Sequence, residues 1–81
     1  MLRQVVLDTE TTGMDPADGH RIIEIGCVEL FNHLPTGKTW HHYINPERDV
    51  PPSSTAITGL TAEFLKPHPI FSKIVEGFLD F

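Results

Sequence analysis

Residues 5–13 read VVLDTETTG, and the rest of the chain is organised around this stretch. An apolar run leads into two acidic residues, Asp8 and Glu10, and then into threonines and a glycine. This pattern predicts a buried strand whose tip carries the two acids. Side chains alternate between the faces of a strand, so Asp8 and Glu10 share one face and Thr9 lies on the other. Gly13 is expected to let the backbone turn away sharply after the strand.

The two carboxylates are predicted to bind a metal ion. Residues two apart on a strand lie roughly 6–7 Å apart, and the longer glutamate side chain lets the two heads converge. Two carboxylates at that separation repel each other, and a cation between them removes the repulsion. Because Mg²⁺ and Mn²⁺ prefer carboxylate oxygens, Asp8 and Glu10 are the candidate ligands of a hard divalent cation. The alternative is a polar strand end that runs into a loop, with both acids solvated.

The motif and its neighbours resemble a known family. VLDTETTG resembles the first motif of the DEDD superfamily of 3′–5′ exonucleases, and HRIIEIGCVEL (His20–Leu30) resembles the segment that follows it, especially in proofreading subunits of bacterial DNA polymerase. YINPERDV (Tyr43–Val50), TGLT (Thr58–Thr61) and the final FLDF extend the likeness over essentially the whole chain. The resemblance implies an α/β, ribonuclease H-like exonuclease fold. Residues 1–81 would form only the N-terminal part of that single domain, with three antiparallel strands followed by helices.

The resemblance also implies a function, which is metal-dependent 3′–5′ exonuclease activity in DNA proofreading. Such phosphodiester hydrolysis uses two divalent cations, Mg²⁺ or Mn²⁺, one for the attacking water and one for the leaving oxygen. Asp8 would bridge both cations, and Glu10 would hold one and approach the 3′-terminal nucleotide. The implied partners are the 3′ end of single-stranded DNA and a DNA polymerase catalytic subunit. The remaining aspartates and a basic histidine are expected beyond residue 81, so the chain alone is predicted to be inactive.

Four further residues are candidates for substrate contacts. Thr11 and Thr12 lie where the family pattern places backbone and hydroxyl contacts to the terminal nucleotide. Ser53 and Thr58 belong to a later segment, where this chain departs from the family. Thr58 stands where the family pattern has a histidine and Ser53 where it often has a glutamate. The family's nucleotide contacts from this loop therefore do not carry over directly, while the metal site is untouched.

The remaining pattern predicts strands over 2–10, 21–31 and 38–44 and a hairpin turn over 32–38 that contains Pro35 and Gly37. Short connections make the three strands antiparallel neighbours. Two short helical segments are expected over 51–58 and 61–65, the second with Thr61 as its N-cap. A long amphipathic helix is expected from about residue 69.

Composition excludes some classes of protein. The formal net charge is −5, with 6 Lys+Arg against 11 Asp+Glu, which argues against a high-affinity, sequence-reading DNA-binding module. A nuclease remains compatible with this charge, because bound cations neutralise the scissile phosphate. Cys27 is the single cysteine and is predicted to pack as a small hydrophobe, in a reduced, cytoplasmic setting. No signal peptide or membrane-spanning stretch is predicted.

Three alternatives remain open. Phosphatases with an aspartyl nucleophile also place acids after an apolar strand, but Glu10 and the following hairpin depart from their D-x-D-x-T pattern. A nuclease-like module could bind nucleotides or a polymerase without catalysis. A related exoribonuclease is the third alternative, since no residue here is expected to recognise a 2′-OH. None of the five histidines is predicted to be the catalytic base, and His20 is expected to be solvated beside a turn.

Overall fold

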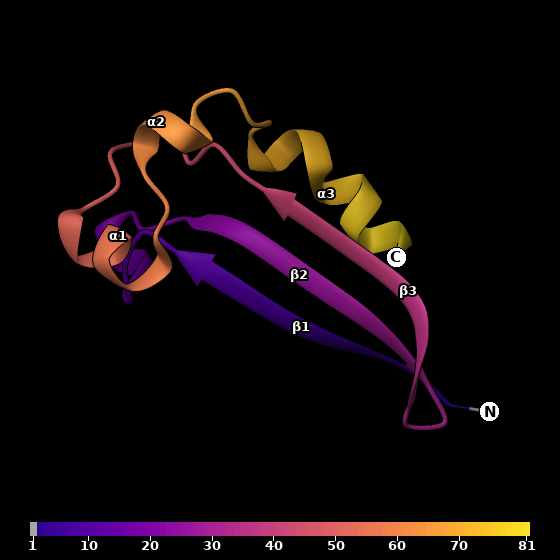
Figure 1. The fold of residues 1–81 in the computed structure, drawn as a ribbon. Helices are drawn as coiled ribbons and strands as arrows, with labels where there is room; N and C mark the ends of the chain where they lie inside the picture. The colour runs from indigo at the N-terminus through magenta and orange to yellow at the C-terminus, as the bar shows by residue number, and fades with distance from the viewer. Residues whose placement is uncertain (1) are drawn as a thin grey trace.

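The computed structural model describes residues 2–81, with the exception of the Pro16 side chain. Its three strands form one antiparallel sheet in the order β1-β2-β3, as predicted. Helix α3 lies along this sheet, while α1 and α2 lie at the end where β1 terminates (Figure 1). The elements are β1 (Arg3–Thr11), the 3-10 helix η1 (Pro16–Asp18), β2 (Ile22–Phe31), β3 (Leu34–Tyr43), α1 (Pro52–Thr58), α2 (Ala62–Leu65) and α3 (Phe71–Asp80).

The turn between β2 and β3 is tighter than predicted. Asn32 and His33 form it with φ values of 50° and 69°, and β3 begins at once with Leu34. Two successive positive φ values are those of a type I′ turn, whose twist matches that of the flanking strands. The predicted loop over 32–38 is therefore wrong. Pro35 and Gly37 lie within β3, an edge strand, where the missing N–H of a proline is tolerated.

The hydrophobic core lies on one face of the sheet. Ile25 and Cys27 of β2 pack there with Ile44 and with Ile74 of α3, and each is at most 6% exposed. Burial raises the pKa of the Cys27 thiol, which keeps it in the neutral form. Cys27 thus packs as a small hydrophobic residue, as predicted. The half-buried residues around this core are Ile22, Trp40, Phe78 and Phe81.

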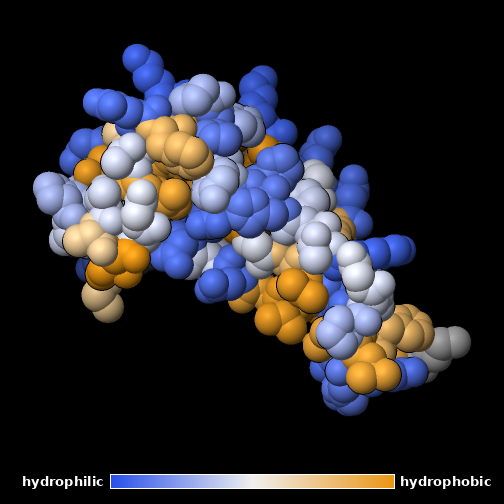
Figure 2. All heavy atoms as spheres, in the orientation of Figure 1, coloured by the Kyte–Doolittle hydropathy of each residue, from blue (hydrophilic) through white to orange (hydrophobic). Residues whose placement is uncertain are grey.

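Strand β1 is an edge strand, and its apolar residues are not buried. Val5, Val6 and Leu7 are 40%, 53% and 51% exposed. Because consecutive residues of a strand lie on opposite faces of the sheet, both faces of β1 are exposed here. Figure 2 shows hydrophobic side chains gathered along the lower edge of the molecule, where β1 runs in Figure 1. The prediction of a buried strand is wrong for the described residues, because α3 packs on β2 and β3 and no element of residues 2–81 pairs with the outer edge of β1.

The helix boundaries follow local signals. Helix α1 begins with Pro52 in its first turn and ends at Gly59, whose φ of 76° is the left-handed conformation that glycine adopts without strain. Thr61 caps α2, because its hydroxyl accepts a hydrogen bond from the Phe64 amide at 3.1 Å. The end of α1 at Gly59 and the start of α2 at Thr61 were both predicted from the sequence. Across residues 2–81, none of the helices has the length and apolar character that a membrane span requires.

Candidate active site

The acids of β1 project from the face of the sheet that α3 leaves bare. Leu7 pairs with Cys27, which lies in the core beneath α3, so the next residue, Asp8, lies on the opposite face. Glu10 shares that face by alternation. Both acids therefore lie on one side, as the sequence predicted, and the hydrophobic core lies on the other.

Neither acid has a protein partner among the described residues. The two arginines that could have neutralised them are engaged elsewhere. Arg3 pairs with Glu29 at 2.6 Å, and Arg21 pairs with Glu47 at 3.8 Å. The carboxylates of Asp8 and Glu10 therefore keep their oxygen lone pairs available to a cation.

The neighbouring strand leaves space beside the acids. Asp8 lies opposite Gly26, which has no side chain, and Glu10 lies opposite Glu24. The Glu24 carboxylate is occupied by His41, whose Nε2 lies 2.5 Å from it. Over residues 2–81, no group of three or more His, Cys, Asp or Glu side chains is arranged to hold a metal ion. Asp8 and Glu10 fit Mg²⁺ or Mn²⁺ in ligand chemistry, as two of the several oxygen ligands that such a cation needs.

A pocket of about 200 Å³ lies at the tip of β1, where Glu10 lines it and Asp8 does not. It brings together three of the predicted site residues, Glu10, Thr11 and Thr58. Met14 and Ile57, which are largely exposed, give it apolar walls. The remaining lining residues are Thr9, Gly13 and Ser54. A carboxylate, hydroxyls and apolar walls in one small cavity are suited to a polar ligand with a flat apolar part, such as a nucleotide.

The tip of β1 is held in place by a shift of strand register and by hydrogen bonds. The β1–β2 register shifts between Glu10 and Thr11, and such irregularities bend a strand and redirect its side chains. The Thr11 hydroxyl donates to the Gly13 carbonyl at 2.6 Å. The Ser54 hydroxyl of α1 donates to the Thr11 carbonyl at 2.8 Å. Helix α1 is therefore bonded directly to the strand tip that carries Glu10.

Two predicted substrate residues lie outside the pocket lining. Thr12 is only 1% exposed and lies beneath the surface, and its hydroxyl accepts the Arg21 amide at 2.9 Å. Ser53 is exposed on α1, while its neighbour Ser54 is buried and lines the pocket. Substrate contacts by Thr12 and Ser53 remain predictions. Sequence reasoning missed Ser54, although successive residues of a helix are rotated by about 100° and only one of the pair can face the strand.

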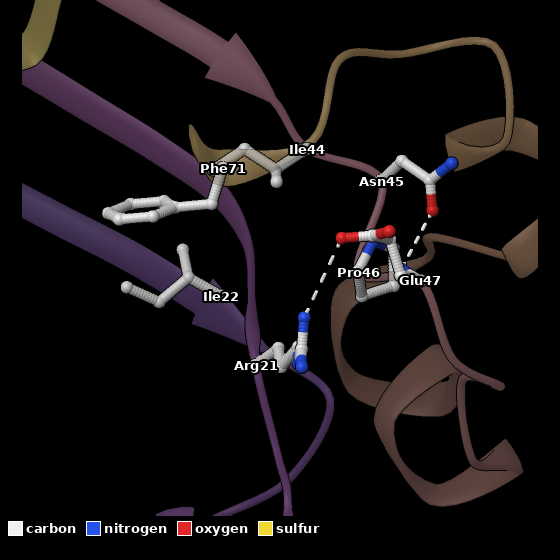
Figure 3. Close-up of a pocket in the computed structure, with 7 residues that line it drawn as sticks. All are labelled: Arg21, Ile22, Ile44, Asn45, Pro46, Glu47 and Phe71. Carbon is white, nitrogen blue, oxygen red and sulfur yellow. Dashed lines mark hydrogen bonds and ion pairs between the residues drawn. The ribbon is translucent and has the colours of Figure 1, made fainter. Parts of the chain in front are cut away.

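A second cavity, of about 270 Å³, lies where β2 begins and β3 ends (Figure 3). Ile22, Ile44 and Phe71 form its apolar part, and the Arg21–Glu47 ion pair spans one side. Asn45 and Pro46 complete the lining. None of the predicted site residues lines this cavity, so the site at the tip of β1 is a separate feature.

Comparison with known sequences gives consistent likenesses. The sequence model of the family RNase_T, described as exonuclease, matches residues 5–81. The chain is 54% identical over 80 residues to the DNA polymerase III subunit epsilon of Rickettsia felis, covering 99% of this chain and 35% of that protein. It is 45% identical over 83 residues to the same subunit of Escherichia coli, covering 98% of this chain and 34% of that protein. The chain thus spans about a third of the length of these relatives.

Solved structures share the arrangement of strands and helices. A full-length 3′-exonuclease superposes with a TM-score of 0.81 at 25% identity, over 96% of this chain and 28% of that one. Exonuclease X in complex with 5′ overhanging duplex DNA gives a TM-score of 0.76 at 25% identity, over 96% of this chain and 43% of that one. In both cases nearly all of this chain is matched to a minor part of a larger protein.

Proposed function

The chain belongs to the RNase_T exonuclease family, and from this membership we propose that it is the N-terminal part of a single 3′–5′ exonuclease domain that removes nucleotides from DNA 3′ ends in proofreading. One observation carries the proposal: Asp8 and Glu10 share the bare face of the sheet, without protein partners among the described residues, and Glu10 lines a pocket. The lack of a third metal ligand in residues 2–81 supports a domain that is completed by further residues.

The proposed roles follow from position. Asp8 and Glu10 would hold divalent cations, Mg²⁺ or Mn²⁺, through their carboxylate oxygens. When bound, such cations supply an activated water and stabilise the charge on the leaving oxygen. Thr58, together with the apolar walls of the pocket, would hold the 3′-terminal nucleotide. The Thr11 carbonyl is held by Ser54, so this part of the pocket is fixed before a substrate arrives.

The substrate and the partner are proposed from the relatives. The similar epsilon proteins are by name subunits of a DNA polymerase, and one similar exonuclease was solved with DNA. We therefore propose DNA as the substrate and a polymerase catalytic subunit as the partner. The single-stranded form of the 3′ end is proposed from the family resemblance alone, since the solved complex holds 5′ overhanging duplex DNA. A complete active site would need ligands and a base beyond those of residues 2–81, so we expect the 81-residue chain alone to be inactive.

The test is cation-dependent release of mononucleotides from the 3′ end of single-stranded DNA by the full-length protein. Asp8→Ala and Glu10→Ala are each expected to lower the rate by at least about a hundredfold, because metal stabilisation of transition-state charge is worth several kcal/mol. Glu63→Ala, which removes an exposed acid of α2, is the matched control and should leave the rate unchanged. Calorimetric Mn²⁺ titration should show weakened binding in the first two variants only.

An unchanged rate in Asp8→Ala would refute the metal assignment. Absent hydrolysis together with retained polymerase binding would instead support a module that binds without catalysis. Faster release from RNA than from DNA would favour the exoribonuclease alternative.

A further inference from the structure

His20 lies where the loop after β1 meets the loop that leads into α1. Its Nδ1 atom is 3.0 Å from the Thr12 hydroxyl and 3.3 Å from Nη1 of Arg48. The sequence predicted a solvated histidine, but the residue is half-buried and has polar neighbours from both loops. Because it lies outside the pocket lining, its effect on the proposed site must pass through Thr12 and Gly13.

Two polar groups lie close to Nδ1 of this ring. An arginine side chain has donors only, so the Arg48 contact is a hydrogen bond only where Nδ1 carries no proton and accepts. The Thr12 hydroxyl accepts from the Arg21 amide at 2.9 Å, which leaves its own proton free to donate to the same Nδ1. Both contacts are hydrogen bonds at the same time only when the ring proton is on Nε2, and they then share the one lone pair of Nδ1.

The ring also packs directly on the turn after β1. A Cβ atom added to Gly13 would lie 2.4 Å from Cε1 and Nε2 of His20, closer than real Cβ contacts occur. Gly13 is not among the glycines with positive φ, so the contact with His20 explains the absence of a side chain there. The chain does bend at Thr12 and Met14, as expected, but this turn does not need a glycine with positive φ.

Arg48 extends the connection to α1. Its Nη1 also donates to the Gly19 carbonyl at 3.0 Å, and its Nε donates to the Asp49 carbonyl at 2.9 Å. The segment that follows Asp49 enters α1, which carries Ser54 and Thr58 into the pocket wall. His20 thus contacts the turn that forms one wall of the pocket and, through Arg48, the loop that leads to the helix of the other wall.

We propose that His20 is a positioning residue: its unprotonated Nδ1 and its ring together hold the turn of residues 11–13 against the loop that leads into α1. The expected effect of His20 variants on kcat/KM rests on the proposed exonuclease function. Its structural part, the acceptor state of Nδ1 and the placement of the turn, can be measured without a substrate.

The test compares His20→Asn with His20→Leu in the full-length protein. The two side chains have nearly the same shape, but only asparagine can place an acceptor oxygen where Nδ1 lies. Both variants lose the outer ring atoms that pack on Gly13, so the difference between them isolates the acceptor, and His20→Asn should keep the higher kcat/KM of the two. His20→Leu should lower kcat/KM on the order of tenfold to a hundredfold, since small misplacements of a site cost that much. Mn²⁺ affinity, which depends on Asp8 and Glu10, should change in neither variant.

Two measurements without substrate separate this proposal from the exonuclease assignment. Long-range ¹H–¹⁵N spectra should show the Nε2–H tautomer of His20 at neutral pH. Exchange of the Arg21 amide, which is bonded to Thr12, should accelerate in His20→Leu and stay slow in His20→Asn. A protonated Nδ1, or equal effects of Leu and Asn on amide exchange, would overturn the proposal even if nuclease activity is confirmed. The expected spectra in a protein without nuclease activity would uphold the structural role and refute only the function.

Discussion

Gly13 shows how one residue constrains the candidate site. The space for its missing side chain is filled by the His20 ring, so any larger residue must displace that ring or the turn itself. Gly59 is a glycine for a different reason, because its φ of 76° strains other residues while nothing lies within 4 Å of its added Cβ. The two positions look alike in the sequence and differ in what a substitution would cost.

Gly13→Ala is expected to destabilise the protein by about 1–3 kcal/mol, the usual cost of overpacking. In a His20→Ser background the three ring atoms nearest the added Cβ are gone, so the same change should cost much less. Urea unfolding of the four proteins of this double-mutant cycle measures the difference. Equal costs in both backgrounds would show that the His20 ring is not what excludes a side chain at residue 13.

At the residue scale, alternation along a strand was enough to place the acids. It put Asp8 and Glu10 on one face without any knowledge of the partner strands. The contacts of Thr12, His20 and Arg48 could not be predicted in this way, because they join residues up to 28 positions apart through loops without periodicity. Such contacts depend on how the loops fold over each other, and no local rule encodes that.

At the scale of elements, the far end of the sheet is held together by one carboxylate. Glu29 of β2 is 8% exposed, accepts from Arg3 of β1 at 2.6 Å and accepts from the Thr36 hydroxyl of β3 at 2.8 Å. The Arg3 hydrogen bond lowers the pKa of Glu29 below its ordinary value of 4.5, and the Thr36 hydrogen bond acts in the same direction. One buried side chain therefore links all three strands.

This linkage predicts a particular loss of stability in acid. The folded state lowers the pKa of Glu29, so its contribution is fully present above pH 4.5 and is lost as the pH falls through the lower folded value. Glu29→Gln should have a lower free energy of unfolding than the parent at neutral pH. As the pH falls below 4.5, the variant should lose less stability than the parent does. Urea unfolding of the full-length protein across this range tests it, with Glu76→Gln, on the exposed side of α3, as the control. Parallel pH curves for the parent and Glu29→Gln would contradict the assignment.

Helix ends were predicted well and the hairpin was not, for one physical reason. Pro52, Gly59 and Thr61 act through their own backbone preferences and caps, which the sequence states directly. The turn at Asn32 and His33 is held by pairing of the flanking strands, which draws Pro35 into β3 despite its preference for loops. Long-range pairing overrode the local signal there.

At the scale of the whole molecule, burial is uneven. Over β2 and β3, one face of the sheet carries the hydrophobic core and the other does not. Strand β1 is open on both faces and along its outer edge. A sequence pattern identifies an apolar strand but does not say which segments cover it. The fold class was therefore predictable, and the exposure of Val6 and Leu7 was not.

The bare strand gives a prediction for the isolated 81-residue chain. We expect it to unfold without a sharp cooperative transition and to release no nucleotides from DNA, since an uncovered apolar edge strand lowers stability and favours aggregation. Cys27, 2% exposed here, should react with a thiol reagent much faster in the isolated chain than in the full-length protein. A steep thermal transition with a protected Cys27 would show that residues 1–81 fold on their own.

The core beneath α3 and the acids on the opposite face share a sheet but no side chains. Substitutions that change the stability of the core and substitutions that change the chemistry of the candidate site can therefore accumulate separately during evolution. A lineage can adapt its heat tolerance through the residues under the helix while it keeps the proposed cation ligands unaltered.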